Sequence, residues 1–338
     1  MGSIQVVGHL TVDITPGLTT VVVPPPGVLA EVGPAVVTLG GAVGNCGRAL
    51  AQLGADAYVA GAVGDDALGR LVAEVLEGQL PGRVDLVVDP ERATGSSIVI
   101  EEPGLDRSYW HHPGANATYT LECPIRADGI VHMGYPPLMA GTCAGAGEPV
   151  AALFARAHRA GCATSLDLAY VADDSPVRAI DWSALLDRLA PETDVLCPSG
   201  DDLARLGELT GTAALCAGVE SAATHLVERG AAVVLVTAGA AGAYLRTGPR
   251  AALDRLSSAC GIDASAWADR SEWAGAPKLA RVRTASGAGD TYKAALLVAL
   301  CRGDDPGSAM AYAAGVSGRY LAGDGVLGPG VLADPRGT

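Results

Sequence analysis

Residues 286–290 read Ser-Gly-Ala-Gly-Asp and directly precede Thr291-Tyr-Lys-Ala-Ala-Leu-Leu-Val-Ala-Leu300, a run that predicts a helix. Small residues at the beginning of a helix let its backbone approach a ligand closely. The free N–H groups of the first turn and the helix dipole favour an anion there. Asp290 would compete with that anion, but it suits a base that deprotonates an attacking hydroxyl while the N–H groups hold a phosphoryl group. Taken alone, Asp290 is equally consistent with a favourable charge in a first helical turn.

Short β-type runs and helical runs alternate along the rest of the chain. This alternation predicts an α/β fold with a mainly parallel sheet and helices on both of its faces. We expect strands at 4–7, 58–63, 84–88, 130–133, 164–168 and 233–236, and helices at 43–53, 66–80, 289–301 and 306–321.

Three stretches interrupt this alternation. Residues 11–38 and 94–112 are β-like, and the second has a turn at Pro103-Gly104. They are either plain surface hairpins or a small sheet that closes over a site and excludes water. The polar, Ala-rich stretch 250–273 has the composition of an insertion with some helix, and its Trp267 and Trp273 either anchor it or flank a nucleotide base.

Composition excludes several classes of protein. With 49% hydrophobic and 18% charged residues, the chain can bury a large core. A net charge of −14 disfavours nucleic acid and anionic membranes as partners.

The N-terminus lacks signal-peptide features and no apolar run has the length of a membrane span, so we expect a cytoplasmic protein. Its eight scattered cysteines are typical of buried free thiols in a reducing compartment.

Two further glycine-rich passages place the first motif in a known context. They are Gly40-Gly-Ala-Val-Gly-Asn45 and Gly61-Ala-Val-Gly-Asp-Asp66. Together with 287–290, they resemble the two signature regions of the PfkB carbohydrate kinases, which include ribokinase, fructokinase and adenosine kinase. Other matches follow in the same order across about residues 4–322, at 8–13, 94–95, 107, 114–116, 167 and 236–242. The resemblance implies one ribokinase-like kinase domain over 1–338, a three-layer sandwich with a small β-sheet lid formed from about 11–38 and 94–112.

The resemblance also implies residue roles. Asp290 would be the catalytic base, beside an anion hole formed by Gly287, Ala288 and Gly289. The residues that would bind the acceptor are Asp13, Gly40, Gly41, Asn45 and Arg107. The residues that would lie near ATP are Thr237, Gly239, Gly242 and Ser199. Without the resemblance, Asp13 is an ordinary strand-end carboxylate and Asn45 a helix cap.

Two departures from the family pattern concern the cofactors. Ser199 and Asp202 stand where the family has Asn and Glu of a magnesium- and phosphate-organising motif. Asp202 keeps a hard oxygen ligand, so Mg²⁺ stays expected, held directly or through water. Thr284-Ala285 stands where the family commonly has Asp-Thr, which removes the usual support of a monovalent cation site.

The expected reaction is ATP-dependent phosphorylation of a hydroxyl on a small sugar-like acceptor. A nucleoside acceptor and a catalytically silent binding homologue are the alternatives. A third alternative is an NAD-dependent oxidoreductase, but the sequence lacks the dinucleotide-binding fingerprint of that class. The adjacent His111 and His112 would face opposite sides of a lid strand, so both cannot enter one pocket. Family members often pair through the lid, and the Val-rich run 19–23 is a candidate edge for a homodimer.

Overall fold

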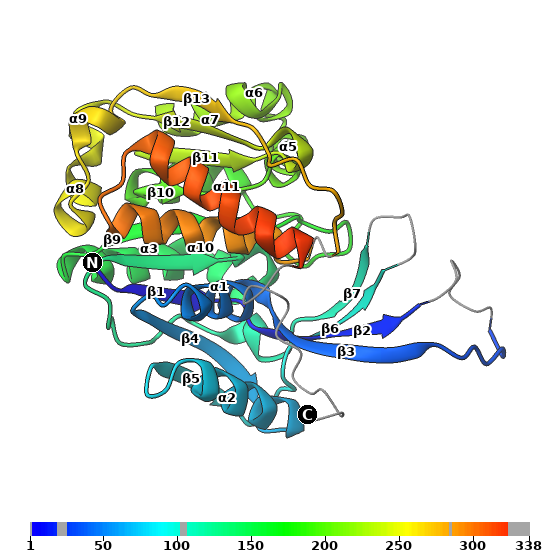
Figure 1. The fold of residues 1–338 in the computed structure, drawn as a ribbon. Coiled ribbons are helices and arrows are strands. Elements are labelled where there is room, and N and C mark those ends of the chain that lie inside the picture. Colours follow the sequence, from blue (N-terminus) through cyan, green and yellow to red (C-terminus); the bar gives the residue numbers. More distant parts are fainter. Residues whose placement is uncertain (1, 19–25, 102–106, 284–285, 324–338) are drawn as a thin grey trace.

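The computed structural model describes residues 2–18, 26–101, 107–283 and 286–323. Its main body is a nine-stranded sheet with the order β13-β12-β11-β10-β9-β8-β1-β4-β5 (Figure 1). The strands from β11 to β5 in this order are parallel, and β12 and β13 continue the sheet antiparallel at one edge. Their bounds are β1 Ile4–Gly8, β4 Ala57–Gly64, β5 Val84–Asp89, β8 Ile130–Gly134, β9 Ala163–Asp167, β10 Val195–Leu196, β11 Val233–Thr237, β12 Ala243–Thr247 and β13 Ser271–Ala274.

Helices cover both faces of this sheet and make it the middle of three layers. One face carries α1 Gly41–Gln52, α2 Ala67–Gln79, α8 Asp254–Cys260, α9 Ala264–Trp267, α10 Ala288–Cys301 and α11 Pro306–Ala322. The other carries α3 Ala144–Arg159, α4 Trp182–Leu189, α5 Gly200–Thr210, α6 Ala213–Cys216 and α7 Val219–Glu228. Short 3-10 helices lie at Gly114–Thr118, Pro136–Leu138, Ala140–Cys143, Ala190–Glu192, Gly239–Ala241 and Arg250–Leu253. The expected sandwich is therefore confirmed.

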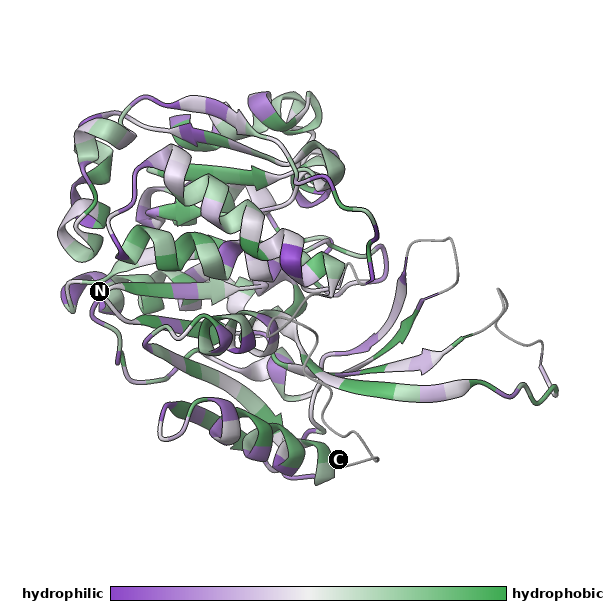
Figure 2. Cartoon of the chain, in the orientation of Figure 1, coloured by the Kyte–Doolittle hydropathy of each residue, from purple (hydrophilic) through white to green (hydrophobic). Residues whose placement is uncertain are grey.

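The apolar strands explain why two cores form. Along β11, Val233 and Leu235 join the core beneath α10, whereas Val234 and Val236 join the core beneath α7. Successive residues of a strand point to opposite faces, so a strand covered on both sides must be apolar throughout. Figure 2 shows the hydrophobic colouring of these central strands. Within the described residues, no helix is both long and apolar enough to cross a membrane.

A separate four-stranded sheet projects from the carboxyl-terminal ends of β1 and β4 (Figure 1). It consists of β2 Thr11–Gly17, β3 Gly33–Gly40, β6 Ser96–Ile100 and β7 Ser108–His112, in the order β3-β2-β6-β7. The two β-like stretches thus form one small sheet apart from the main one, as expected. The turn at Pro103-Gly104 and the run 19–23 lie outside the described residues.

The stretch 250–273 contains helices α8 and α9 and ends in β13, which extends the main sheet by pairing with β12. Trp267 is completely buried, and its indole N–H donates to the Asp304 carbonyl at 3.1 Å. It therefore anchors this segment to the core instead of flanking a nucleotide base. Trp273 is 44% exposed, and its N–H donates to the Glu220 carboxylate at 2.7 Å.

Candidate active site

Asp290 lies in the first turn of α10, which Gly287 introduces with a left-handed backbone, φ +77°. A side chain at Gly287 would come within 3.1 Å of both Asn45 and Tyr320, so glycine also serves the close approach of this turn to α1 and α11. The Asp290 side chain is buried, 2% exposed. Asp290 is the third residue of α10, so an anion bound at the N–H groups of the first turn would lie close to this carboxylate.

Two side chains hold the Asp290 carboxylate. The Asn45 amide donates to Oδ2 at 2.9 Å, and the Tyr135 hydroxyl donates to Oδ1 at 2.6 Å. Tyr135 follows β8 in a left-handed conformation, φ +66°, which is uncommon for a residue with a side chain and aims its phenol at Asp290. Burial, followed by the charge of Asp290, raises the pKa of Tyr135, so the phenol stays a donor. The carboxylate is fixed in one orientation.

Asn45 reaches Asp290 because α1 begins directly against the end of β1. Gly41 has φ +72°, and a Cβ there would lie 2.5 Å from the His9 carbonyl. Only glycine accommodates this backbone at that distance. The glycine-rich passages at 40–45 and 286–290 therefore meet at one site, where Asn45 contacts the expected base itself.

Asp13 enters the same site from the lid strand β2. A Cβ on Gly40 would lie 2.1 Å from the Asp13 carboxylate, so the glycine makes room for it. Burial raises the pKa of Asp13, while hydrogen bonds from Thr11 and Ser97 oppose the rise and the charge of Asp290 adds to it. Gly40 directly precedes α1, so Asp13 lies beside the start of the helix that carries Asn45.

Asp13 belongs to a cross-strand row on one face of the lid. The registers pair Thr38 with Asp13, Asp13 with Ser97, and Ser97 with His111. Ser97 Oγ lies 3.2 Å from His111 Nδ1. His112 pairs with Ser96 and therefore faces the other side, as expected.

His9 forms the floor between the lid and the base. Its ring centroid lies 5.0 Å from that of His111 and 6.1 Å from that of Tyr135. It is 2% exposed, and neither ring nitrogen has a hydrogen-bond partner within the described residues. Burial, and then His111, lowers its pKa to about 3, so the ring is neutral. A neutral imidazole has one nitrogen that donates and one that accepts a hydrogen bond, and in His9 both are unpaired within the described residues.

The far end of the lid touches the motif turn. Arg107 donates to the Tyr109 hydroxyl, which lies 3.2 Å from Ser286 Oγ, beside the anion-hole residues. Arg107 therefore lies at the lid's contact with this turn. Its expected role in acceptor binding stays a prediction.

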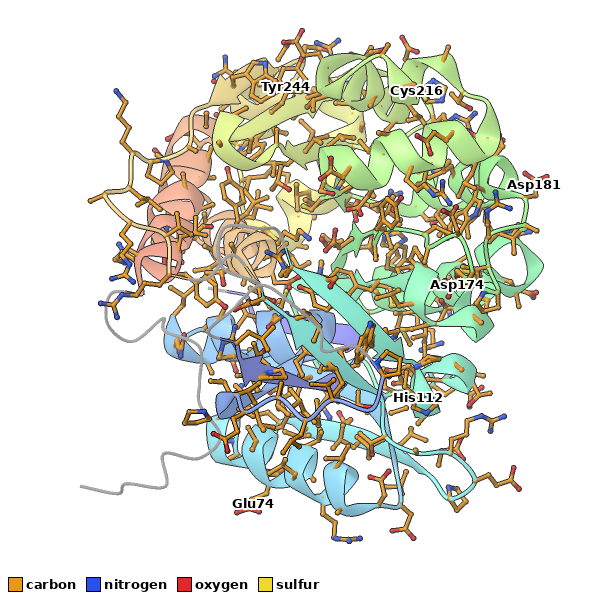
Figure 3. The ribbon with its side chains drawn as sticks, turned by 90° about the vertical axis from the view of Figure 1, so that its right-hand side faces the viewer. Glu74, His112, Asp174, Asp181, Cys216 and Tyr244 are labelled. Atoms are coloured by element: carbon orange, nitrogen blue, oxygen red, sulfur yellow. The ribbon has the colours of Figure 1, made fainter. Side chains whose placement is uncertain are left out.

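The expected nucleotide-side residues gather at the ends of β10 and β11. Ser199 and Thr237 form a β-bridge, and both line a pocket of about 400 Å³ together with Gly239. Gly242 has φ +103°, and a Cβ there would lie 2.1 Å from the Ala274 carbonyl. Cys216 also lines this pocket, and in Figure 3 it lies well away from His112 of the lid. The pocket is thus a separate region from the acceptor end.

Asp202 has a local structural role. It is the third residue of α5 and completes a capping box, in which the Ser199 hydroxyl accepts from the Asp202 N–H and the Asp202 carboxylate accepts from the Ser199 N–H at 3.0 Å. This pairing fixes the start of α5. Its expected role as a metal ligand stays a prediction.

A magnesium ion would suit the carboxylates at this edge of the sheet. Oδ1 of Asp167, at the end of β9, is buried without a hydrogen-bond partner among the described residues. Burial raises the pKa of Asp167, Lys293 opposes the rise, and the charges of Asp290 and then Asp202 add to it. No group of three or more His, Cys, Asp and Glu within the described residues could hold a metal alone. Mg²⁺ typically uses one or two carboxylates with waters and substrate phosphates, so these residues fit it.

Four further side chains lie next to Asp290 or the lid, and no sequence motif predicted a role for them: His9, Tyr135, Lys293 and Cys46. The Cys46 thiol lies 3.9 Å from Asp290 Oδ1. His9 and Tyr135 each follow a central parallel strand directly, where ligands of α/β sheets bind, so that position was an available signal.

Comparison with known proteins accords with this geometry. The pattern of the pfkB family carbohydrate kinases matches residues 1–319. Thermotoga maritima ribokinase is 19% identical, with a TM-score of 0.69 over 95% of this chain and 93% of its own. Arabidopsis thaliana ribokinase, complexed with ribose and ATP, is 20% identical, with a TM-score of 0.66 over 95% and 92%. A Burkholderia thailandensis nucleoside kinase, complexed with inosine, is 18% identical, with a TM-score of 0.69 over 97% and 94%.

No curated protein matches this sequence. At these identities the solved structures establish the fold, and the pattern across residues 1–319 establishes the family. The chain, with its ribokinase-like sandwich, its separate small sheet and its Gly-Ala-Gly-Asp turn, belongs to the pfkB family of carbohydrate kinases.

Proposed function

We propose that the protein transfers the γ-phosphoryl group of ATP to a hydroxyl of a small sugar-like acceptor, with Asp290 as the base. One observation carries this proposal: a buried carboxylate, held by Asn45 and Tyr135, lies at the glycine-flanked N-terminus of α10. A carboxylate that is oriented and shielded from water can accept a proton, and the adjacent backbone N–H groups can stabilise the transferred anion.

The acceptor would bind between the lid and the floor of the site. Asp13 accepts hydrogen bonds from hydroxyl groups, and the two unpartnered nitrogens of His9 offer one donor and one acceptor. The Tyr109–Ser286 contact brings the lid onto the turn of Gly287–Gly289, which would exclude water. These groups favour an acceptor rich in hydroxyls, and a nucleoside offers the same kind of ribose edge.

In the reaction, the acceptor oxygen forms a bond to the γ-phosphorus as the bond from that phosphorus to the β-γ bridging oxygen breaks. The acceptor proton passes to Asp290, and the products are a phosphate ester and ADP. Backbone N–H groups of Gly287, Ala288 and Gly289 donate to the phosphoryl oxygens. A magnesium ion at Asp167 and Asp202 would neutralise phosphate charge.

Thr237, Gly239, Gly242 and Ser199 would contact the nucleotide, since they gather at one end of the sheet. A monovalent cation is not part of this proposal, because the positions that would support it, 284–285, carry Thr and Ala and lie outside the described residues.

We also propose a homodimer through the lid. Val37, Ile14, Ile98 and Trp110 form one apolar cross-strand row on the face opposite Asp13, and Trp110 is 59% exposed. A second copy covering this row would bury the indole. The thiols of all eight cysteines are free, which suits a reducing compartment such as the cytoplasm.

The test measures ADP release from ATP and Mg²⁺ with a panel of pentoses, hexoses and nucleosides. Asp290→Asn should lower kcat by about 10²–10⁴-fold for any acceptor found. Asp254→Asn is the matched control, because Asp254 is an exposed first-turn carboxylate on α8 and should leave the rate unchanged. Full turnover by Asp290→Asn would refute the assigned base. Acceptor binding without any ADP release would favour the silent-homologue alternative.

A further inference from the structure

Lys293 carries a buried ammonium group in the centre of the site. It lies one turn after Asp290 on α10 and is 5% exposed. Its side chain runs back toward the N-terminus of the helix, as helical side chains do. The Nζ atom lies 3.9 Å from Asp290 Oδ1 and 3.8 Å from the position that a Cβ on Gly289 would occupy. The ammonium thus lies beside Asp290 and next to the space that a side chain at residue 289 would occupy.

The charge of Lys293 is maintained by carboxylates on two elements. Nζ donates to Asp167 Oδ2 on β9. Burial opposes the charged form, but Asp167 and Asp290 outweigh it and raise the pKa of Lys293, so it remains an ammonium. Several other titratable groups act on this cluster: Asp202, Asp13, Tyr320, Cys46, Cys197, Tyr135 and His132.

An ammonium has three N–H donors, and Asp167 takes one of them. Among the described residues, Asp167 is the one acceptor hydrogen-bonded to Nζ, so two N–H donors are left for a ligand. A buried ion pair adds little to stability compared with apolar residues of the same size. The choice of residue is also unusual for this chain, whose only lysines are Lys278 and Lys293 among 23 basic residues. Lysine supplies a compact point charge where a planar guanidinium needs more room.

We propose that Lys293 is a catalytic cation that donates hydrogen bonds to the γ-phosphoryl group during transfer, and that Asp167 holds the ammonium between turnovers. This inference rests on the proposed kinase reaction. Lys293 transfers no proton: the acceptor proton passes to Asp290, and the ammonium only balances the charge on the phosphoryl oxygens. Because Nζ lies 3.9 Å from Asp290 Oδ1, it also reduces the repulsion between the carboxylate and the incoming phosphate.

The first test is nucleotide binding, which needs no acceptor. Calorimetric titration with ADP and with the non-hydrolysable analogue AMP-PNP, both with Mg²⁺, compares ligands that differ in the γ-phosphoryl group. Lys293→Met should weaken AMP-PNP binding at least tenfold more than ADP binding, whereas Lys278→Met, at an exposed lysine, should change neither. An equal effect on both nucleotides would overturn the inference. If the unaltered protein binds neither nucleotide, the proposed function fails instead.

The second test separates catalysis from folding, because Lys293→Met alone leaves Asp167 unpaired. Asp167→Asn/Lys293→Met removes both charges and should refold as stably as Asp167→Asn, with a similar urea midpoint. With an acceptor from the panel, kcat of the double variant should still be about 10²-fold below that of Asp167→Asn, with acceptor KM little changed. If the two variants turn over equally, Lys293 serves only to neutralise Asp167 and the inference is wrong.

Discussion

The Asn45 side-chain amide donates to the Asp290 carboxylate at 2.9 Å, across 245 positions of sequence. This bond joins α1 to the first turn of α10, and both helices begin in glycine-rich passages. Tyr135 holds the other carboxylate oxygen from the end of β8. Asp290 is therefore oriented by residues from two other elements, and the helix that carries it is only one of its supports.

Removing the amide should disturb this orientation. We expect Asn45→Ala to lower kcat by about tenfold, because a hydrogen bond to a charged group is worth about 1.5–3 kcal/mol and part of that orients the base. Asn45→Asp should lower kcat further, since it places a second carboxylate beside Asp290. The measurement is steady-state kinetics with the acceptor identified by the panel. Wild-type kcat in both variants would show that Asn45 does not position the base.

Gly40 controls the position of Asp13. A Cβ at residue 40 would lie 2.1 Å from the Asp13 carboxylate, so Gly40→Ala must displace that side chain. We expect acceptor KM to rise about tenfold or more, which corresponds to about 1.4 kcal/mol, while the Kd for ADP stays unchanged. Gly78→Ala is the matched control, because a Cβ at residue 78 would meet no neighbouring atom within 4 Å and an alanine suits the helix interior. An unchanged acceptor KM would contradict the assignment of Asp13.

His132 should make stability depend on pH. It is completely buried on β8, and burial, followed by the charge of Lys293, lowers its pKa to about 3. The unfolded chain binds a proton near pH 6.5 that the folded protein excludes, so stability is full above that pH and falls as pH drops toward 3. His132→Asn, which can keep the bond to Ser165, should reduce the loss between pH 6 and pH 5 by about 1 kcal/mol.

Urea unfolding at the two pH values measures this difference. Ser165→Ala removes the hydrogen-bond partner and no titrating group, so it should lower stability equally at both pH values. Identical pH dependence in His132→Asn and the unaltered protein would show that His132 does not supply this proton linkage.

The order of strands and helices was predictable because local patterns report it directly. The apolar run at 233–236 predicts a doubly covered strand, and 66–80 predicts a helix that the structure begins after its Asp66 cap. The strand at the end of the 250–273 stretch was harder to predict. The four-residue β13 is partly exposed, and it is a strand only because it pairs with β12. Edge strands of this kind carry little periodic signal.

Local patterns were enough to predict the α/β layers and the glycine-rich turn with Asp290, because strand and helix periods and glycine backbones are local properties. The small sheet was one of two interpretations of 11–38 and 94–112, and the family resemblance favoured it over plain hairpins. Only the tertiary structure decided that Asn45 and Tyr135 hold Asp290, that Asp202 closes a capping box, and that Lys293 lies between Asp167 and Asp290. These contacts join residues of different elements at the carboxyl ends of parallel strands. Their distances depend on how the layers pack, which no local pattern specifies.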